Sequence, residues 1–498
     1  MCLSFLLHDM RIFAFILRKS IIQVVIMNRN TEQRRAKQTS PYLLVILSFV
    51  GVIIFGAFLL SLPFSHKSGQ WSDLRGIVDA LFHATSATCV TGLSTYVNGI
   101  GAELTFFGQL VMLVMIQIGG LGFITILTFF ASLIQKRLQF KDRYMLAQAV
   151  NSNSIADVGK FVKRVVIIVV TAESFGFFLG LPVFFSIKGI NPGQAIWASL
   201  FTSISAFNNA GFDIFGATSI IRGVGNAYID NMPLWAYYYM QCYIMILIVV
   251  GGISFLTIIE TVFQRKKARQ WSAFTRISLL MTSILLVTGF ALFCLTDVIN
   301  GNINPFQALF QSVTCRTAGF ANFDQSTLSP AGKTVSSVLM FIGGSPIGTA
   351  GGIKTTTIFV IVLCLIRFLQ GKKISAFKRE FSKTSIIKSM TLLFLAVVVI
   401  VIGYILVITF EKVGAKNSDT VPQDTTENLL FETFSAFGTV GLSTGVTPYL
   451  TTGSKLVICV LMFFGRLGPI TLFQIFQTNM NNEKTTHYQE VQTDVIIG

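Results

Sequence analysis

Apolar residues run along this chain in long, nearly unbroken stretches. Each stretch of about 20 residues or more is long enough to cross the roughly 30 Å of a bilayer's hydrocarbon core as a helix. Eight such stretches form four pairs, at 41–62 and 105–134, 165–187 and 234–263, 276–296 and 335–369, and 386–410 and 455–478. The pattern predicts an all-α polytopic membrane protein.

A short apolar segment with a glycine near its end lies between the two long stretches of each pair. The four segments occupy residues 82–94, 201–213, 310–321 and 431–443. Each starts at a Phe and reaches its glycine nine or ten residues later, at Gly92, Gly211, Gly319 and Gly441. Because these segments are too short to span, we expect each to enter the membrane as a pore helix and return. The recurrence predicts four membrane–pore–membrane repeats around one pseudo-fourfold ion path, with four packed helix kinks as the alternative.

The repeats divide the chain into six parts. We expect a segment 1–40, repeats at 41–135, 160–263, 273–370 and 384–480, and a tail at 481–498. Residues 1–28 are apolar but interrupted by Arg11, Arg18 and Lys19. They fit neither a signal peptide nor a span. An interfacial amphipathic stretch and a true start at Met27 both stay open.

Composition and charge agree with a membrane protein. The 498 residues are 52% hydrophobic and 12% charged, with a mean hydropathy of +0.69, against about 25% charged in soluble proteins. This excludes a soluble enzyme, a secreted disulfide scaffold and a nucleic-acid binder. Twenty-six of the 38 Lys and Arg lie in 1–37, 136–164, 265–276 and 367–388, one segment before each pair of long stretches. The asymmetry predicts that these segments, and so the N-terminus, are cytoplasmic.

Nothing in the sequence indicates catalysis. The seven Cys and four His are scattered without metal-ligand spacing, and no HExxH, GxSxG or paired-carboxylate arrangement occurs. We therefore expect a protein that is not an enzyme and has no cofactor.

The glycine segments have the properties of an ion filter. A re-entrant backbone leaves carbonyls unpaired, which is tolerated only where they line a water-filled cavity or are buried in protein. There they can replace the hydration shell of an ion, and the negative C-terminal end of each short helix favours a cation. Glycine allows the positive φ that turns successive carbonyls toward one axis. The candidate filter residues are Val90, Thr91, Gly92, Asn209, Ala210, Gly211, Thr317, Ala318, Gly319, Thr439, Val440 and Gly441.

A glycine-rich run at 343–354 interrupts the last stretch of the third repeat. It is not a Walker A loop, because Ile353 separates Gly352 from Lys354 and both flanks are membrane stretches. We expect an unwound segment below the filter, with a passive kink as the alternative. Arg466 lies inside an apolar helix, where an unpaired charge is costly. It is expected to face the cavity and to pair with carbonyls of 343–352, and snorkelling is the alternative.

Three further motifs identify a family resemblance. They are VTCRTAGF at 313–320, GGSPIGTAGGIKT at 343–355 and GRLGP at 465–469. With the four glycine segments, they make residues 40–480 resemble the superfamily of potassium transporters that contains TrkH, KtrB and the plant HKT proteins. The resemblance implies potassium uptake, with Gly92 favouring potassium because a serine there goes with sodium. It also implies an intramembrane gating loop, with Arg466 holding it from the neighbouring repeat. The gating glycines are Gly343, Gly344, Gly348, Gly351 and Gly352.

The chain resembles KtrB more than TrkH, because the 40 residues before the first repeat cannot supply the extra helix pair of TrkH. A KtrB-type protein implies a homodimer in the plasma membrane, regulated by a separate cytosolic ring of Rossmann-type nucleotide-binding subunits, with potassium as substrate and sodium as a candidate activator. Two alternatives stay open. One is a sodium-selective or sodium-coupled transporter of the same architecture, and the other is a non-transporting receptor, which the short polar links disfavour.

Charged residues near the filter have simpler interpretations. The resemblance implies that Arg316 ties down the third hairpin by hydrogen bonds. Asp79 and Glu432 lie in the pore-helix segments, and we interpret them as partners of the helix dipole. Glu173 and Glu260 are expected to form hydrogen bonds between helices.

Overall fold

The computed structural model describes residues 41–69, 73–122, 158–216, 219–223, 227–264, 268–377, 379–414 and 426–468. The expectations for 1–40 and 481–498 lie outside these ranges. The described part is helical apart from one two-stranded hairpin, β1 (Ser375–Ala376) and β2 (Arg379–Glu380). Short helical turns complete it, namely η1 (Pro63–Ser65), α4 (Ile100–Glu103), α10 (Ala227–Asp230), η2 (Ile259–Phe263), η3 (Ala268–Gln270), η4 (Cys294–Val298), η5 (Gln325–Thr327) and η7 (Thr447–Tyr449).

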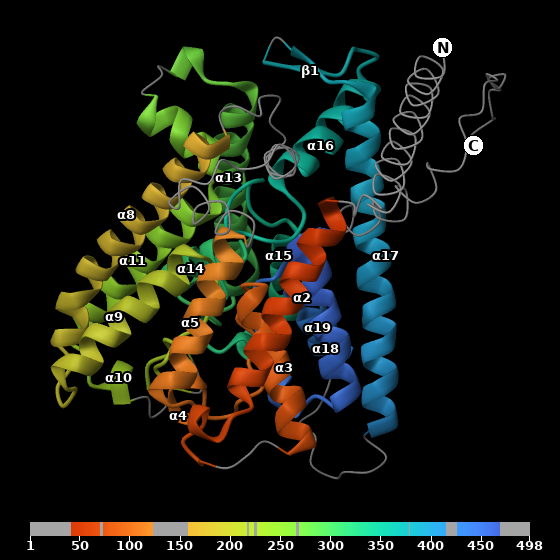
Figure 1. The fold of residues 1–498 in the computed structure, drawn as a ribbon. Helices are drawn as coiled ribbons and strands as arrows, with labels where there is room; N and C mark the ends of the chain where they lie inside the picture. Colours follow the sequence, from red (N-terminus) through yellow and green to blue (C-terminus); the bar gives the residue numbers. More distant parts are fainter. Residues whose placement is uncertain are drawn as a thin grey trace, which may run out of the picture.

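The first helix of each repeat lies where the apolar stretches predict it. These helices are α2 (Pro41–Leu60), α8 (Val158–Phe185), α13 (Ala273–Phe293) and α17 (Lys383–Gly414). Their outer faces carry exposed Phe side chains, such as Phe55, Phe178 and Phe394. Apolar side chains on an outer helix face are typical of contact with lipid rather than water. Figure 1 shows α17 as a long helix at one side of the molecule.

The second helices are α5 (Phe106–Leu121), α11 (Leu234–Gly252), α15 (Pro330–Phe341) and α19 (Thr452–Leu467). The sequence predicts a continuous stretch at 234–263, and this is wrong in detail, whereas the interruption expected at 343–354 is present. The second repeat breaks at 253–254 before α12 (Phe255–Ile258), and the third breaks at 342–354 before α16 (Thr355–Leu369). Both breaks follow or contain paired glycines, which weaken a helix. Of the described helices, only Phe161–Phe185, Leu234–Gly252, Ala273–Val298 and Lys383–Lys412 are individually long and apolar enough to span.

A pore helix lies between the two long helices of each repeat. The four are α3 (Leu74–Thr88), α9 (Pro192–Phe207), α14 (Pro305–Thr314) and α18 (Thr426–Gly438). Local sequence explains where three of them begin. Asp73 caps α3 through Gly76 N, and Asn191 and Asn304 form capping boxes with a proline at the next position. Each pore helix ends one to three residues before the start of a candidate filter segment.

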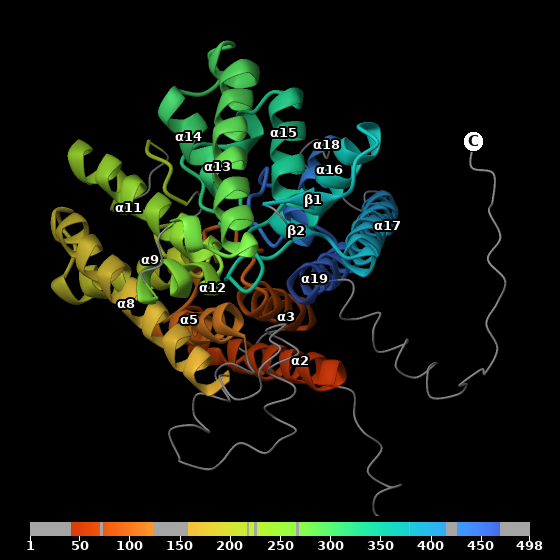
Figure 2. The ribbon, with the colours of Figure 1, turned by 90° about the horizontal axis from the view of Figure 1, so that it is seen from above.

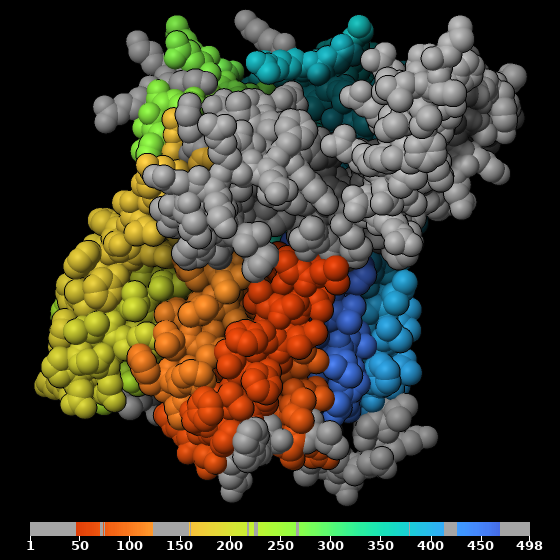
Figure 3. All heavy atoms as spheres, in the orientation of Figure 1, coloured from red at the N-terminus to blue at the C-terminus, as the bar shows by residue number. Residues whose placement is uncertain are grey.

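The repeats surround a common centre in chain order (Figure 2). The second helix of each repeat packs against the pore helix of the next, in the pairs α5–α9, α11–α14, α15–α18 and α19–α3. The last pair closes the ring and includes an ion pair between Lys455 and Asp79, with 2.6 Å between Nζ and Oδ1. On the face drawn in Figure 3, the first repeat lies between the second and the fourth. The leading Phe of each pore segment (Phe82, Phe201, Phe310, Phe431) is fully buried in this assembly.

Candidate functional site

The four hairpin glycines form a closed ring at the centre of the repeats. Their φ angles are 100° at Gly92, 68° at Gly211, 78° at Gly319 and 95° at Gly441, a region that disfavours any side chain. A Cβ at Gly92 would lie 2.6 Å from the carbonyl oxygen of Ala210, and one at Gly211 would lie 2.7 Å from that of Ala318. A Cβ at Gly319 would overlap the Val440 carbonyl, and one at Gly441 the Thr91 carbonyl. Each glycine therefore abuts the filter segment of the next repeat.

The residue two positions before each glycine is also left-handed. Its φ is 58° at Val90, 58° at Asn209, 68° at Thr317 and 51° at Thr439. This conformation is strained for β-branched residues, with a cost on the order of 1–3 kcal/mol each. Sequence reasoning expected a positive φ only at the glycines. The surrounding protein must impose this backbone, since Val90 and the two threonines would not adopt it alone.

Hydroxyl groups of the pore helices hold the hairpins in place. Ser86 Oγ donates to Leu93 O at 2.8 Å, Ser205 Oγ to Phe212 O at 2.6 Å, and Thr314 Oγ1 to Phe320 O at 2.7 Å. In the fourth repeat Ser435 Oγ accepts from Gly441 N at 3.1 Å. These hydroxyls all come four residues after the leading Phe. The recurring Phe-x-x-x-Ser/Thr pattern was a signal that sequence reasoning missed.

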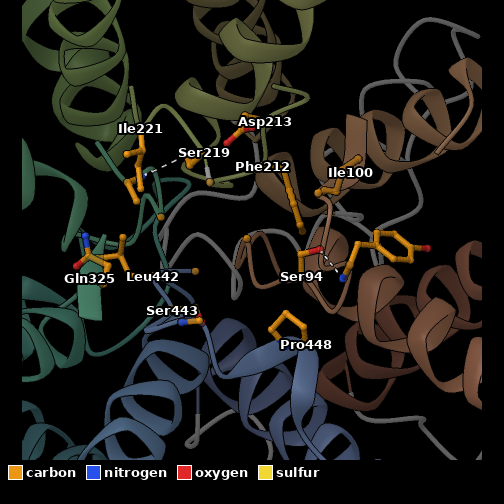
Figure 4. Close-up of a pocket in the computed structure, with 18 of the residues that line it drawn as sticks. Ser94, Ile100, Phe212, Asp213, Ser219, Ile221, Gln325, Leu442, Ser443 and Pro448 are labelled. Carbon is orange, nitrogen blue, oxygen red and sulfur yellow. Dashed lines mark hydrogen bonds between the residues drawn. The ribbon is translucent and has the colours of Figure 1, made fainter. Parts of the chain in front are cut away.

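A cavity of about 340 Å³ opens on one side of the glycine ring. All four repeats contribute to its wall, as the labelled residues of Figure 4 show. Among the described residues that line it, Asp213 and Asp324 are acidic and none is Lys or Arg. Acidic lining in a concave site raises the local concentration of cations. The cavity thus has the charge expected for a cation entrance.

Residues 342–354 form an ordered loop on the other side of the ring. Gly343 N donates to Ile353 O at 2.9 Å, so the two ends of the loop pair with each other. The loop also docks on the helix break of the second repeat, where Ser345 N donates to Gly252 O at 3.1 Å and Thr349 Oγ1 to Gly251 O at 2.9 Å. A Cβ at Gly351 would overlap the hydroxyl of Thr439. The loop therefore lies directly against the fourth candidate filter segment.

Two cationic side chains bind the carbonyls of this loop. Arg466, in the last turn of α19, donates through Nη1 to Thr349 O and through Nη2 to Gly119 O, and Nη2 also lies 3.4 Å from Gly120 O. Lys354 Nζ donates to Ala350 O at 2.6 Å. No carboxylate of the described residues forms an ion pair with either. The contact with Thr349 agrees with the sequence expectation, whereas the contact with Gly119 was not foreseen.

The remaining predicted residues have varied surroundings. Arg316 is buried and donates to Thr282 Oγ1 at 3.3 Å, which agrees with a tethering role. Glu173 accepts from Gln117 at 3.1 Å and Asn208 at 2.9 Å, as expected of hydrogen bonds between helices. Glu260, in η2, likewise accepts from Thr275 of α13, and also from Ser272, which caps that helix. Asp79 and Glu432 have specific partners besides the helix dipole, because Asp79 pairs with Lys455 and Glu432 bonds the chain beyond its own hairpin. Within the described residues, no three His, Cys, Asp or Glu groups could hold a metal ion.

A polytopic helical chain with a fourfold ring of glycine hairpins beside an acidic cavity defines a membrane protein that transports cations. Comparison with known proteins agrees with this class. The model of the TrkH family, described as "Cation transport protein", matches residues 27–153 and 144–488. The chain belongs to this family, whose members are ion transporters and not enzymes.

Two relatives support the assignment, and a solved structure matches the fold. The chain is 35% identical over 458 residues to the Ktr system potassium uptake protein B of Bacillus subtilis, covering 89% of this chain and 94% of that one. It is 32% identical over 475 residues to the potassium/sodium uptake protein NtpJ of Enterococcus hirae, covering 94% and 99%. The crystal structure of the potassium transporter TrkH from Vibrio parahaemolyticus matches its fold with a TM-score of 0.63 at 18% identity, covering 88% and 86%.

Proposed function

We propose that this protein is the ion-translocating subunit of a potassium uptake system in the plasma membrane. The observation that carries the proposal is the ring in which each of four glycines, all at positive φ, abuts a carbonyl of the next repeat. Two relatives that the chain matches over most of their length are described as potassium or potassium/sodium uptake proteins. The membrane potential drives ions from the acidic cavity through the ring.

In this proposal the carbonyl groups of the candidate filter bind the ion. The oxygens of Thr91, Ala210, Ala318 and Val440 lie around the ring, each beside a glycine of the neighbouring repeat. Carbonyls in such a ring replace the water around an entering cation. Side chains differ between the repeats, which is acceptable if only the backbone contacts the ion.

Uptake measurements test the proposal. The protein is expressed in a strain that lacks its own potassium uptake systems, and initial uptake of potassium or rubidium is measured with and without sodium. We expect potassium uptake that exceeds sodium uptake under equal gradients. Sodium uptake equal to or above potassium uptake would instead favour the sodium-selective alternative, which the potassium/sodium relative keeps relevant.

The loop 342–354 is proposed as the gate. It lies against Thr439 and is tethered by Arg466, so it blocks the path on the side of the ring opposite the acidic cavity. Its many glycines suit a segment that must change conformation. The passive-kink alternative predicts that shortening the loop does not raise transport.

Orientation, assembly and repeat boundaries complete the proposal. The β1–β2 hairpin lies at the end of the molecule opposite α4 and α10, which supports a cytoplasmic 367–388 and an external Arg222 (Figure 1). Single cysteines at Arg222 and Arg269 should therefore react with an impermeant thiol reagent from opposite sides.

We further propose repeats at 41–135, 160–263, 273–370 and 384–480, a homodimer, and a separate cytosolic nucleotide-binding regulator. Co-purification with such a regulator, followed by native mass spectrometry, tests the last two.

A further inference from the structure

Glu432 is a fully buried carboxylate in the pore helix α18. Its Oε1 accepts hydrogen bonds from Ser443 Oγ at 2.5 Å and from Thr444 N at 3.1 Å. Its Oε2 accepts from Thr447 Oγ1 at 2.8 Å. An ionised carboxylate can only accept, so three converging donors match its chemistry.

All three donors belong to the chain that leaves the fourth candidate filter segment. Ser443 and Thr444 come two and three residues after Gly441 and line the acidic cavity. One turn further along α18, Ser435 Oγ accepts from Gly441 N. Two side chains of α18 thus hold the hairpin. Ser435 binds Gly441 itself, and Glu432 binds the residues that follow it.

The equivalent residue of the other repeats follows the leading Phe in the same way. In the first repeat, His83 Nε2 bonds Ser94 Oγ at 3.0 Å and accepts from Thr95 N at 3.3 Å. In the third, Gln311 donates to Gln325 Oε1 at 2.7 Å. In the second, Thr202 is fully buried and its hydroxyl has no hydrogen-bond partner. The side chain after the leading Phe therefore bonds the segment that follows the hairpin glycine in the first and fourth repeats. In the second repeat Thr202 forms no such bond.

We propose that Glu432 is a positioning residue that sets the ion selectivity of the fourth filter segment. The inference rests on the proposed function, because it assumes that the glycine ring discriminates between ions. The carboxylate fixes Ser443, Thr444 and Thr447, and so holds Gly441 and the Val440 carbonyl at one distance from the axis. Without it, this part of the ring can close around the smaller sodium ion, so selectivity falls while the path stays open.

The test compares Glu432→Gln with Thr202→Val, a nearly isosteric change at the same position of the second repeat. Gln places an amide donor against hydroxyl and amide donors, whereas Val removes a hydroxyl that has no partner. We measure initial potassium and sodium uptake per transporter copy, with KM and Vmax for each ion. We expect the potassium-to-sodium ratio to fall about tenfold in Glu432→Gln, equivalent to about 1.4 kcal/mol. Thr202→Val should keep the wild-type ratio.

A second pair of variants removes the hydroxyl donors of these bonds and leaves the Glu432 carboxylate in place. Ser443→Ala and Thr447→Val should each lower the ratio by less than Glu432→Gln, and neither should lower it further in the Glu432→Gln background. If Glu432→Gln does not reach the membrane, the ratios of Ser443→Ala and Thr447→Val alone test the inference. Glu432→Asp should restore part of the ratio, because it keeps the charge.

The outcomes separate this inference from the proposed function. A wild-type protein without potassium preference would overturn the proposed function. A potassium-selective wild type whose ratio is unchanged in Glu432→Gln, or in both Ser443→Ala and Thr447→Val, would overturn the inference alone. Equal losses of Vmax for both ions at an unchanged ratio would assign Glu432 a purely structural role and also overturn it.

Discussion

The glycine ring and the loop 342–354 lie against each other but are held in different ways. Each hairpin of the ring is fixed by its own pore helix, through a hydroxyl only six or seven residues away in the chain. The loop is closed by its own bonds, from Gly343 N to Ile353 O and from Lys354 Nζ to Ala350 O, but its docking depends on other repeats. It bonds Gly251 and Gly252 of the second repeat, and Arg466 of the fourth repeat connects it to Gly119 of the first.

This difference separates two tasks. A ring built from four locally held hairpins keeps its geometry when neighbouring elements move. A single loop held by a few distant contacts can be released without disturbing the ring, because Arg466 takes part in none of the described hydrogen bonds that fix a hairpin. If the two tasks are separate, releasing the loop changes the rate of uptake, whereas altering the ring changes its selectivity.

Removing the tether of the loop should have the largest effect. Arg466→Gln loses charge-assisted hydrogen bonds worth about 1.5–3 kcal/mol, so the closed state weakens and uptake rises about 10- to 100-fold if the wild type is mostly closed. Deleting several of the glycines between 343 and 352 should act in the same direction. Initial uptake velocity per copy is measured, with protein amount checked by blot. A lower maximal rate in both variants at normal expression would assign the loop to permeation or folding.

Substitutions in the ring should change selectivity rather than rate. A Cβ at Gly441 or Gly319 overlaps a neighbouring carbonyl more severely than one at Gly92 or Gly211. Together with the left-handed φ, this gives a penalty of about 2 kcal/mol, or about 30-fold in the potassium-to-sodium ratio. Gly441→Ser should therefore lose more selectivity than Gly92→Ser, which should still transport. Four serine variants with the wild-type ratio would remove the filter assignment.

The pore-helix hydroxyls should have a smaller effect. Ser205→Ala deletes one neutral hydrogen bond, to Phe212 O, worth about 1 kcal/mol. We expect the potassium-to-sodium ratio to fall about fivefold. Ser283→Ala is a matched control, because that serine is exposed on α13 and bonds only its own helix. Equal effects of the two changes would show that the hydroxyls do not support the hairpins.

The ion pair between Lys455 and Asp79 should have the smallest effect. Both side chains are partly exposed, at 13% and 26%, and such pairs contribute less than about 1 kcal/mol. Lys455→Met should lower the thermal midpoint of detergent-solubilised protein by a few degrees at most and leave selectivity unchanged. A large loss of selectivity would show that contact between the first and fourth repeats controls the ring.

The sequence predicted the repeats because their signals are local. Four long apolar stretches are each followed by a Phe and a glycine at nearly constant spacing. This pattern can be recognised without knowing which residues contact one another in the fold. The break at 253–254 was missed because apolar residues continue through it, so only the docked loop distinguishes it. The left-handed φ of Val90 was missed because the bonds of its neighbours impose it. The partners of Arg466 and Lys455 lie hundreds of residues away, and only ring closure brings them together.

The position of a bound cation tests the central assignment most directly. Rubidium scatters anomalously and substitutes for potassium, so diffraction from crystals of the protein in rubidium would locate it. We predict anomalous density on the axis of the ring, among the carbonyl oxygens of Thr91, Ala210, Ala318 and Val440. Rubidium found only elsewhere, in a protein that transports it, would contradict the assignment of these hairpins as the filter.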